Sequence, residues 1–129
     1  MKNIIFYLGM GTLFTHELDA MFNHEWRMLP LTSWLPEETG MLVFLFFHVP
    51  LFAGLIALVA SKHDRIRFRS RIGVSAFLLF HAALHAFFGG NPAYEFFSLS
   101  SSILIYGGAL LGSIHLLFEY INQRSVHKP

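Results

Sequence analysis

The segment Met41–Ala60, MLVFLFFHVPLFAGLIALVA, sets the class of fold of this 129-residue chain. It contains no formally charged side chain, and its interruptions are His48, Pro50 and Gly54. Twenty residues of α-helix rise about 30 Å, which matches the hydrocarbon thickness of a bilayer. The segment therefore predicts a membrane-spanning helix over residues 41–60.

The composition agrees with a lipid environment. Apolar residues make up 54 % of the chain and charged residues only 13 %, whereas soluble domains are about a quarter charged. The net charge of +1 gives no reason to expect nucleic acid as a partner. Because the chain has no cysteine, disulfides and thiolate chemistry are excluded, and any metal must be bound by nitrogen or oxygen.

Three further apolar segments predict helices over residues 4–22, 72–88 and 96–118. Together with 41–60 they predict a single all-α transmembrane domain, residues 1–129, built as an integral membrane four-helix bundle. The first segment also resembles a signal peptide, because Lys2 precedes its apolar run. No small-x-small cleavage site follows, so we expect a retained helix.

The distribution of basic residues predicts the orientation. Five of the nine Lys and Arg lie in Lys62–Arg71 (KHDRIRFRSR), between the second and third predicted helices. The positive-inside rule places this segment in the cytoplasm, and four helices then place both termini there too. We expect a multi-pass protein of the bacterial inner membrane, with the lipid bilayer and either further copies or an unidentified membrane complex as partners.

Every predicted helix carries polar residues at a similar depth. His81 and His85 are spaced i, i+4 and therefore project from one helix face. His16 and Asp19, spaced i, i+3, share a face of the first helix, and His48 interrupts the second. Ionisable groups inside a membrane cost on the order of 2.5–3.5 kcal/mol by insertion scales and usually mark functional sites.

This convergence predicts a metal site inside the membrane. Imidazole and carboxylate ligands suit Zn or non-haem Fe, acting on a lipid-soluble or small substrate. The expected opening is on the outer side, with residues 23–39 as its lid. The expected ligands are His16, Asp19, His48, His81 and His85, and the expected proton acceptors are Glu17 and Glu95.

Structural readings of the same residues remain open. His48 precedes Val49 and Pro50, so its ring could bond a carbonyl freed by the proline kink. His16 and Asp19 could form only a local ion pair, and Glu95 could cap the fourth helix.

The segments HELDA (16–20) and HAALH (81–85), with His48 between them and Asn91–Pro92 after them, resemble a known type of protein. They are similar to small four-helix bacterial membrane proteins of unknown function, including the group with a His-x-x-Glu-Glu motif. Here that motif is His16-Glu17-Leu18-Asp19-Ala20, which lacks the second acidic position. The resemblance implies a recurring His and acid cluster in four helices, without an established activity.

Three other functions compete with the metal site. A b-type haem protein would use His48 with His81 or His85 as axial ligands. A metal-free site would move protons between His and Asp in an isomerase or transporter. A structural accessory subunit would use the polar groups to hold helices together. The sequence does not decide whether the protein is an enzyme.

Overall fold

The computed structural model describes the backbone of residues 1–126 and their side chains up to residue 124. His127 and Lys128, expected at the cytoplasmic surface, lie outside the described residues. Within them the order is α1 (Lys2–Phe22), the short 3-10 helix η1 (Glu25–Arg27), α2 (Glu37–Val59), α3 (Asp64–Phe88) and α4 (Leu99–Val126). The described part is all-α and contains no strand.

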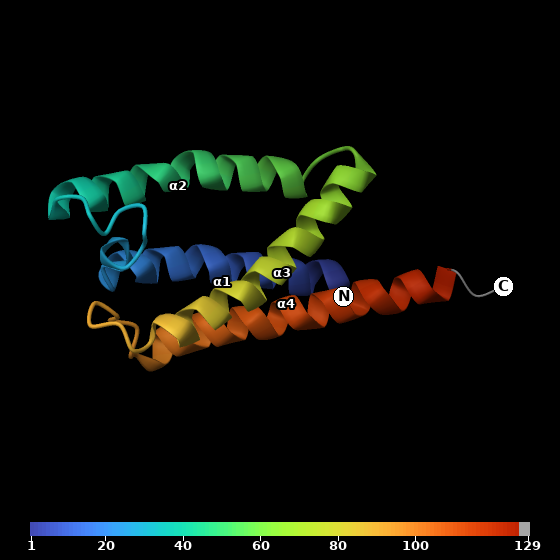
Figure 1. Ribbon diagram of the computed structural model, residues 1–129. Coiled ribbons are helices and arrows are strands. Elements are labelled where there is room, and N and C mark those ends of the chain that lie inside the picture. The colour runs from blue at the N-terminus through green and yellow to red at the C-terminus, as the bar shows by residue number, and fades with distance from the viewer. Residues whose placement is uncertain (127–129) are drawn as a thin grey trace.

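Three helices of the described chain are long and apolar enough to cross a membrane: α2, α3 and α4, the last counted to Arg124. Figure 1 shows α1, α2 and α4 lying lengthwise across the view and α3 crossing obliquely, with the α2–α3 turn at the same end as the start of α1 and the end of α4. The loops 23–36 and 89–98 lie together at the opposite end.

The helix boundaries follow local sequence signals. Pro36 precedes α2, and Glu37 and Glu38 occupy its first turn, where carboxylates complement the helix dipole. Helix α3 begins at Asp64, well before the expected residue 72, so most of the basic segment forms its first turns. Long Arg side chains on those turns can reach the interface from a helical backbone, so the charges do not end the helix.

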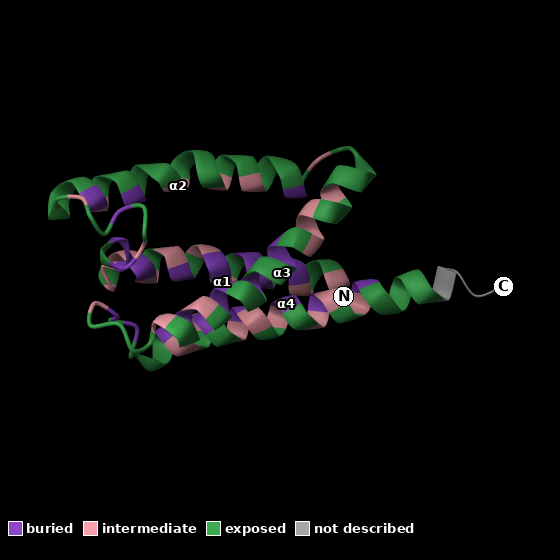
Figure 2. Ribbon diagram, in the orientation of Figure 1, coloured by how far each residue is buried: buried purple, intermediate pink, exposed green. Residues whose placement is uncertain are grey.

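The helices are packed unevenly. Helix α4 lies along both α1 and α3, whereas α2 contacts mainly α3 and η1. Figure 2 shows buried positions gathered where α1, α3 and α4 face one another, while α2 is exposed along most of its length. Helix α4 approaches α3 closely at Gly112, where an added Cβ would lie 2.6 Å from the carbonyl oxygen of Ser75.

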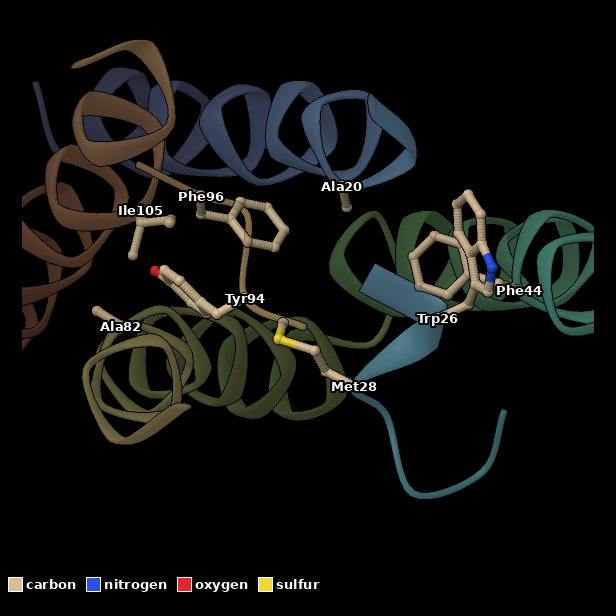
Figure 3. Close-up of a cluster of buried hydrophobic side chains, with 8 residues drawn as sticks. All are labelled: Ala20, Trp26, Met28, Phe44, Ala82, Tyr94, Phe96 and Ile105. Atoms are coloured by element: carbon tan, nitrogen blue, oxygen red, sulfur yellow. The ribbon is translucent and has the colours of Figure 1, made fainter. Parts of the chain in front are cut away.

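A hydrophobic cluster secures the loop end of the bundle. Its members come from every helix and from both loops (Figure 3): Ala20, Trp26, Met28, Phe44, Ala82, Tyr94, Phe96 and Ile105. Trp26 lies beside Phe44 of α2, with ring centroids 6.2 Å apart, and Tyr94 packs on Phe96 at 5.4 Å. These contacts fix the loops over the ends of the helices that carry His16 and His85.

Candidate metal centre

Three histidines from two helices meet inside the bundle. The Nε2 atoms of His81 and His85 on α3 are 3.3 Å apart. The His16 ring from α1 lies 4.7 Å from the His81 ring and 4.9 Å from the His85 ring, centroid to centroid. His16 is only 1 % exposed. The structure thus brings together three of the five residues expected as ligands.

The fourth member is Glu25, which the sequence analysis did not include. His24 adopts a left-handed conformation (φ 50°), and η1 begins at the next residue. That reversal turns Glu25 back toward α1, where its Oε2 lies 4.0 Å from His16 Nε2. Its carboxylate is buried beside the histidines, and one ligand atom from each of His16, Glu25, His81 and His85 lies within 4.8 Å of the others.

The electrostatics of Glu25 reflect its burial. Removal from water raises the pKa of Glu25 to about 8, and the nearby negative charge of Glu17 adds to the shift. A neutral carboxyl group is therefore favoured until a cation compensates its charge.

Several nitrogen atoms in this group are buried without a hydrogen-bond partner among the described residues. They are both ring nitrogens of His16 and Nδ1 of His85. An unsatisfied buried polar group costs roughly 1–3 kcal/mol, so such atoms require an explanation. Bound metal would satisfy one lone pair on each imidazole.

The spacing and chemistry of the group fit a metal ion. Ligand atoms at ~2 Å from a tetrahedral zinc ion stand about 3.3 Å apart, as the Nε2 atoms of His81 and His85 do. Three imidazoles and a carboxylate suit Zn²⁺ or Fe²⁺. The separation of His16 from Glu25 is larger, so those two side chains would draw together around the ion.

His48 and Glu17 form a separate pair. His48 Nε2 lies 2.9 Å from Glu17 Oε2, and His48 Nδ1 lies 2.7 Å from the carbonyl oxygen of Phe44. Because a carbonyl only accepts, Nδ1 carries a proton, and a second proton is shared between Nε2 and Glu17. Both nitrogens of His48 are therefore engaged outside the four-residue group.

The other two expected site residues are not among the four, although the charge of Asp19 is near enough to add to the raised pKa of Glu25. Asp19 Oδ2 is buried without a hydrogen-bond partner in the described part of the chain. Glu95 lies at the loop end, where it accepts hydrogen bonds from His24 (2.8 Å) and Arg27 (3.1 Å). The hydrogen bond from His24 lowers the pKa of Glu95 below its ordinary value.

A cavity of about 330 Å³ connects the two polar clusters. It lies between α2, α3 and the loop after η1, and its wall includes Glu17, His48, Glu25, His81 and His85. Its remaining lining is apolar apart from Thr32. Asn91, Glu95 and the Ser98–Ser102 run are not part of this wall.

The fold and the site define a class of small all-helical proteins. Its members have helices long and apolar enough for a membrane, and a buried group of three histidines and one glutamate. Within that class, the chain belongs to a family of unknown function, DUF6713, whose model matches residues 2–122. The match does not confirm the His-x-x-Glu-Glu group or a bacterial source. Comparison with curated proteins and with solved structures gave no match.

Proposed function

We propose that this protein is a four-helix integral membrane protein that binds one Zn²⁺ or Fe²⁺ ion through His16, Glu25, His81 and His85. The observation that carries the proposal is the burial of four ligating atoms within 4.8 Å of one another. His81 and His85 share one hydrogen bond, but both ring nitrogens of His16 and Nδ1 of His85 are buried without a partner beside the Glu25 carboxylate. Structural cores rarely bury such groups together, because each group loses its hydration. A metal ion offsets that loss for all four.

The proposal includes α1 as the fourth span. Its polar residues need not face lipid, since His16 is fully enclosed and Glu17 is paired with His48. The basic turns of α3 and the start of α1 share one end of the bundle, whereas Glu37 and Glu95 lie at the other. By the positive-inside rule, both termini are cytoplasmic and the centre lies toward the outer side.

The residues around this centre would have different roles, in proton transfer or in structure. An ion that took a fifth ligand beside these four would polarise a bound carbonyl or lower the pKa of a bound water. Glu17 and His48 hold a shared proton at the edge of the same cavity, so they are placed to accept or donate one during turnover. Glu95, paired with His24 and Arg27, would instead hold the outer loops together.

Haem binding has less support than a single ion. The rings of His16, His81 and His85 pack edge-on against one another, at interplanar angles of 68°, 86° and 85°. Axial ligands must lie on opposite faces of a flat macrocycle, with one iron atom between them. The rings of His16, His81 and His85 are in mutual contact and leave no room for such a plane. His48, the expected partner of His81 or His85 as an axial ligand, has both ring nitrogens engaged with Phe44 and Glu17.

Metal analysis of the purified protein tests the proposal. We expect about one equivalent of Zn or Fe after purification, and X-ray absorption should show nitrogen and oxygen ligands at ~2 Å. H85Q should lose the metal. H115Q is the matched control, because His115 is an equally buried histidine that hydrogen-bonds Ser75 (2.8 Å) outside the centre.

E25Q provides a second variant if H85Q does not fold, since it changes only one carboxylate oxygen and should weaken binding of the ion. Far-UV circular dichroism and size-exclusion profiles would establish that each variant is folded. A wild-type metal content far below one equivalent, or equal losses in H85Q and H115Q, would refute the proposal.

A further inference from the structure

The cavity beside the centre has one polar end and one apolar side. Its polar end is formed by Glu17, His48, Glu25, His81 and His85. The wall away from these groups consists of hydrocarbon side chains on α2 and α3, chiefly Val43, Phe47, Leu51, Phe77, Leu84 and Phe88. A molecule that satisfied both parts would itself be polar at one end and apolar over the rest.

The apolar side opens at the surface between α2 and α3. Phe47, Leu51 and Phe77 line the cavity and yet are 58 %, 43 % and 43 % exposed. At 1.5 Å per residue, Val43 and Leu51 lie about 9 Å and about 21 Å from the start of α2. In a membrane-spanning α2, this opening faces hydrocarbon rather than water.

The water-facing end of the cavity is covered by the loop after η1. Met28, Leu29 and Thr32 from this loop line the cavity. Thr32 is held there because its hydroxyl donates a hydrogen bond of 2.7 Å to the carbonyl oxygen of Trp26. A polar solute approaching from the outer side would have to displace this loop, whereas a molecule in the bilayer would meet an open side.

We propose that the cavity binds a long-chain, lipid-soluble molecule with a single polar head, which enters sideways from the bilayer between α2 and α3. The inference rests on the proposed metal centre. The head lies between the metal ligands and the Glu17–His48 pair, and the chain leaves between Phe47 and Phe77 into the hydrocarbon. The substrate class is therefore a membrane amphiphile rather than a water-soluble metabolite.

Two hydroxamates test this proposal, because both present the same metal-binding head. The protein would be reconstituted in lipid nanodiscs and loaded with Co²⁺, whose visible spectrum reports its coordination. Acetohydroxamic acid measures access to the ion alone, and dodecanohydroxamic acid adds a chain that fits the apolar side. We expect the long-chain probe to bind about tenfold more tightly or better, since each buried methylene adds affinity.

Partition into the bilayer also favours the long-chain probe, so paired variants are required. V43W fills the cavity wall, and V49W places the same residue on an exposed part of α2 that is not in the wall. V43W should lose the long-chain advantage seen in V49W while still binding acetohydroxamic acid. L51W, which alters the same wall, replaces V43W if that variant does not fold.

The outcomes separate the two proposals. No cobalt spectrum would refute the metal centre and with it this inference. A cobalt spectrum that neither hydroxamate changes would support the metal centre but refute the binding of a polar head at the ion. The other refuting result is a normal response to acetohydroxamic acid together with the same long-chain affinity in V43W, L51W and V49W. It would support the metal centre but refute the binding of an amphiphile in the cavity. Such a result would also be expected if bilayer lipid merely filled the space.

Discussion

Replacing Gly112 with alanine should separate α3 from α4 and destabilise the bundle. The added Cβ would lie 2.6 Å from the carbonyl oxygen of Ser75, and 3.1 Å and 3.2 Å from side-chain atoms of Leu79 and Leu78. The oxygen belongs to a helix backbone and cannot rotate aside. Relief therefore requires movement of a whole helix. Gly107 is the matched control in the same helix, because a Cβ there meets nothing within 4 Å.

Two opposing contributions determine the size of the effect. Overpacking a close interface costs about 1–3 kcal/mol. Alanine gains roughly 0.5–1 kcal/mol over glycine within a helix, through the smaller backbone entropy of the unfolded chain. For G112A the overpacking is the larger contribution, which predicts a net loss of up to about 2.5 kcal/mol. For G107A only the gain remains, so that variant should be unchanged or slightly more stable.

The free energy of unfolding would be measured by titrating detergent-solubilised protein with a denaturing detergent, with helicity followed by circular dichroism. G112S would provide a further variant at the same position, because its side chain also begins with a Cβ and should also destabilise. Equal stability of G112A and G107A, within about 0.5 kcal/mol, would show that α3 and α4 do not pack as closely as the structure shows.

Three other predictions concern the loops and the orientation. T32V should cost about 1–2 kcal/mol in the same unfolding assay, because it leaves the buried carbonyl of Trp26 without its hydroxyl donor; T32S should retain most of the stability, and equal losses would contradict the assigned bond. In metal-free protein, Glu25 binds its proton more tightly in the folded state than in the unfolded chain. Its contribution to stability should therefore fall as pH rises from its ordinary pKa to about 8, and then level off. The melting temperatures of wild type and E25Q should differ in pH dependence over that interval, and parallel curves would refute the raised pKa. A reporter fused to the C-terminus should be active only in the cytoplasm, and activity only outside would invert the topology.

The sequence predicts the helical architecture because hydropathy and length determine it almost alone. The uncharged run 41–60 falls within α2 apart from its last residue, which is the C-cap. The start of α3 is less predictable, because Arg65, Arg67, Arg69 and Arg71 suggest a loop by composition. As helical residues, two of them reach protein partners: Arg67 donates to the Ser61 carbonyl at 2.8 Å, and Arg71 donates to the Val59 carbonyl at 3.2 Å.

The candidate site is only partly predictable for a similar reason. His81 and His85 share a helix face through spacing alone, and matching depth brings His16 to them. The position of Glu25 depends on one backbone reversal at His24, which no periodicity encodes. A sequence signal did exist, since an adjacent His and Glu directly follow the helix that carries His16. The partners of His48 depend on the side of α2 from which its side chain projects, and the depth of His48 in the membrane does not define that side.

The attachment of α2 at both ends has a consequence for the membrane that surrounds it. At the loop end of the bundle, Glu37 accepts hydrogen bonds from Arg27 (2.8 Å) and Trp26 (3.2 Å). At the opposite end, Arg71 donates to the Val59 carbonyl at 3.2 Å.

Between these anchors the 23 residues of α2 span about 34 Å. A free helix adapts to a thinner or thicker bilayer by tilting, but a helix fastened at both water boundaries tilts only with the whole bundle. Membrane thickness would then act along the length of α2 as tension or compression, and a bilayer whose thickness matches that length should stabilise the protein most.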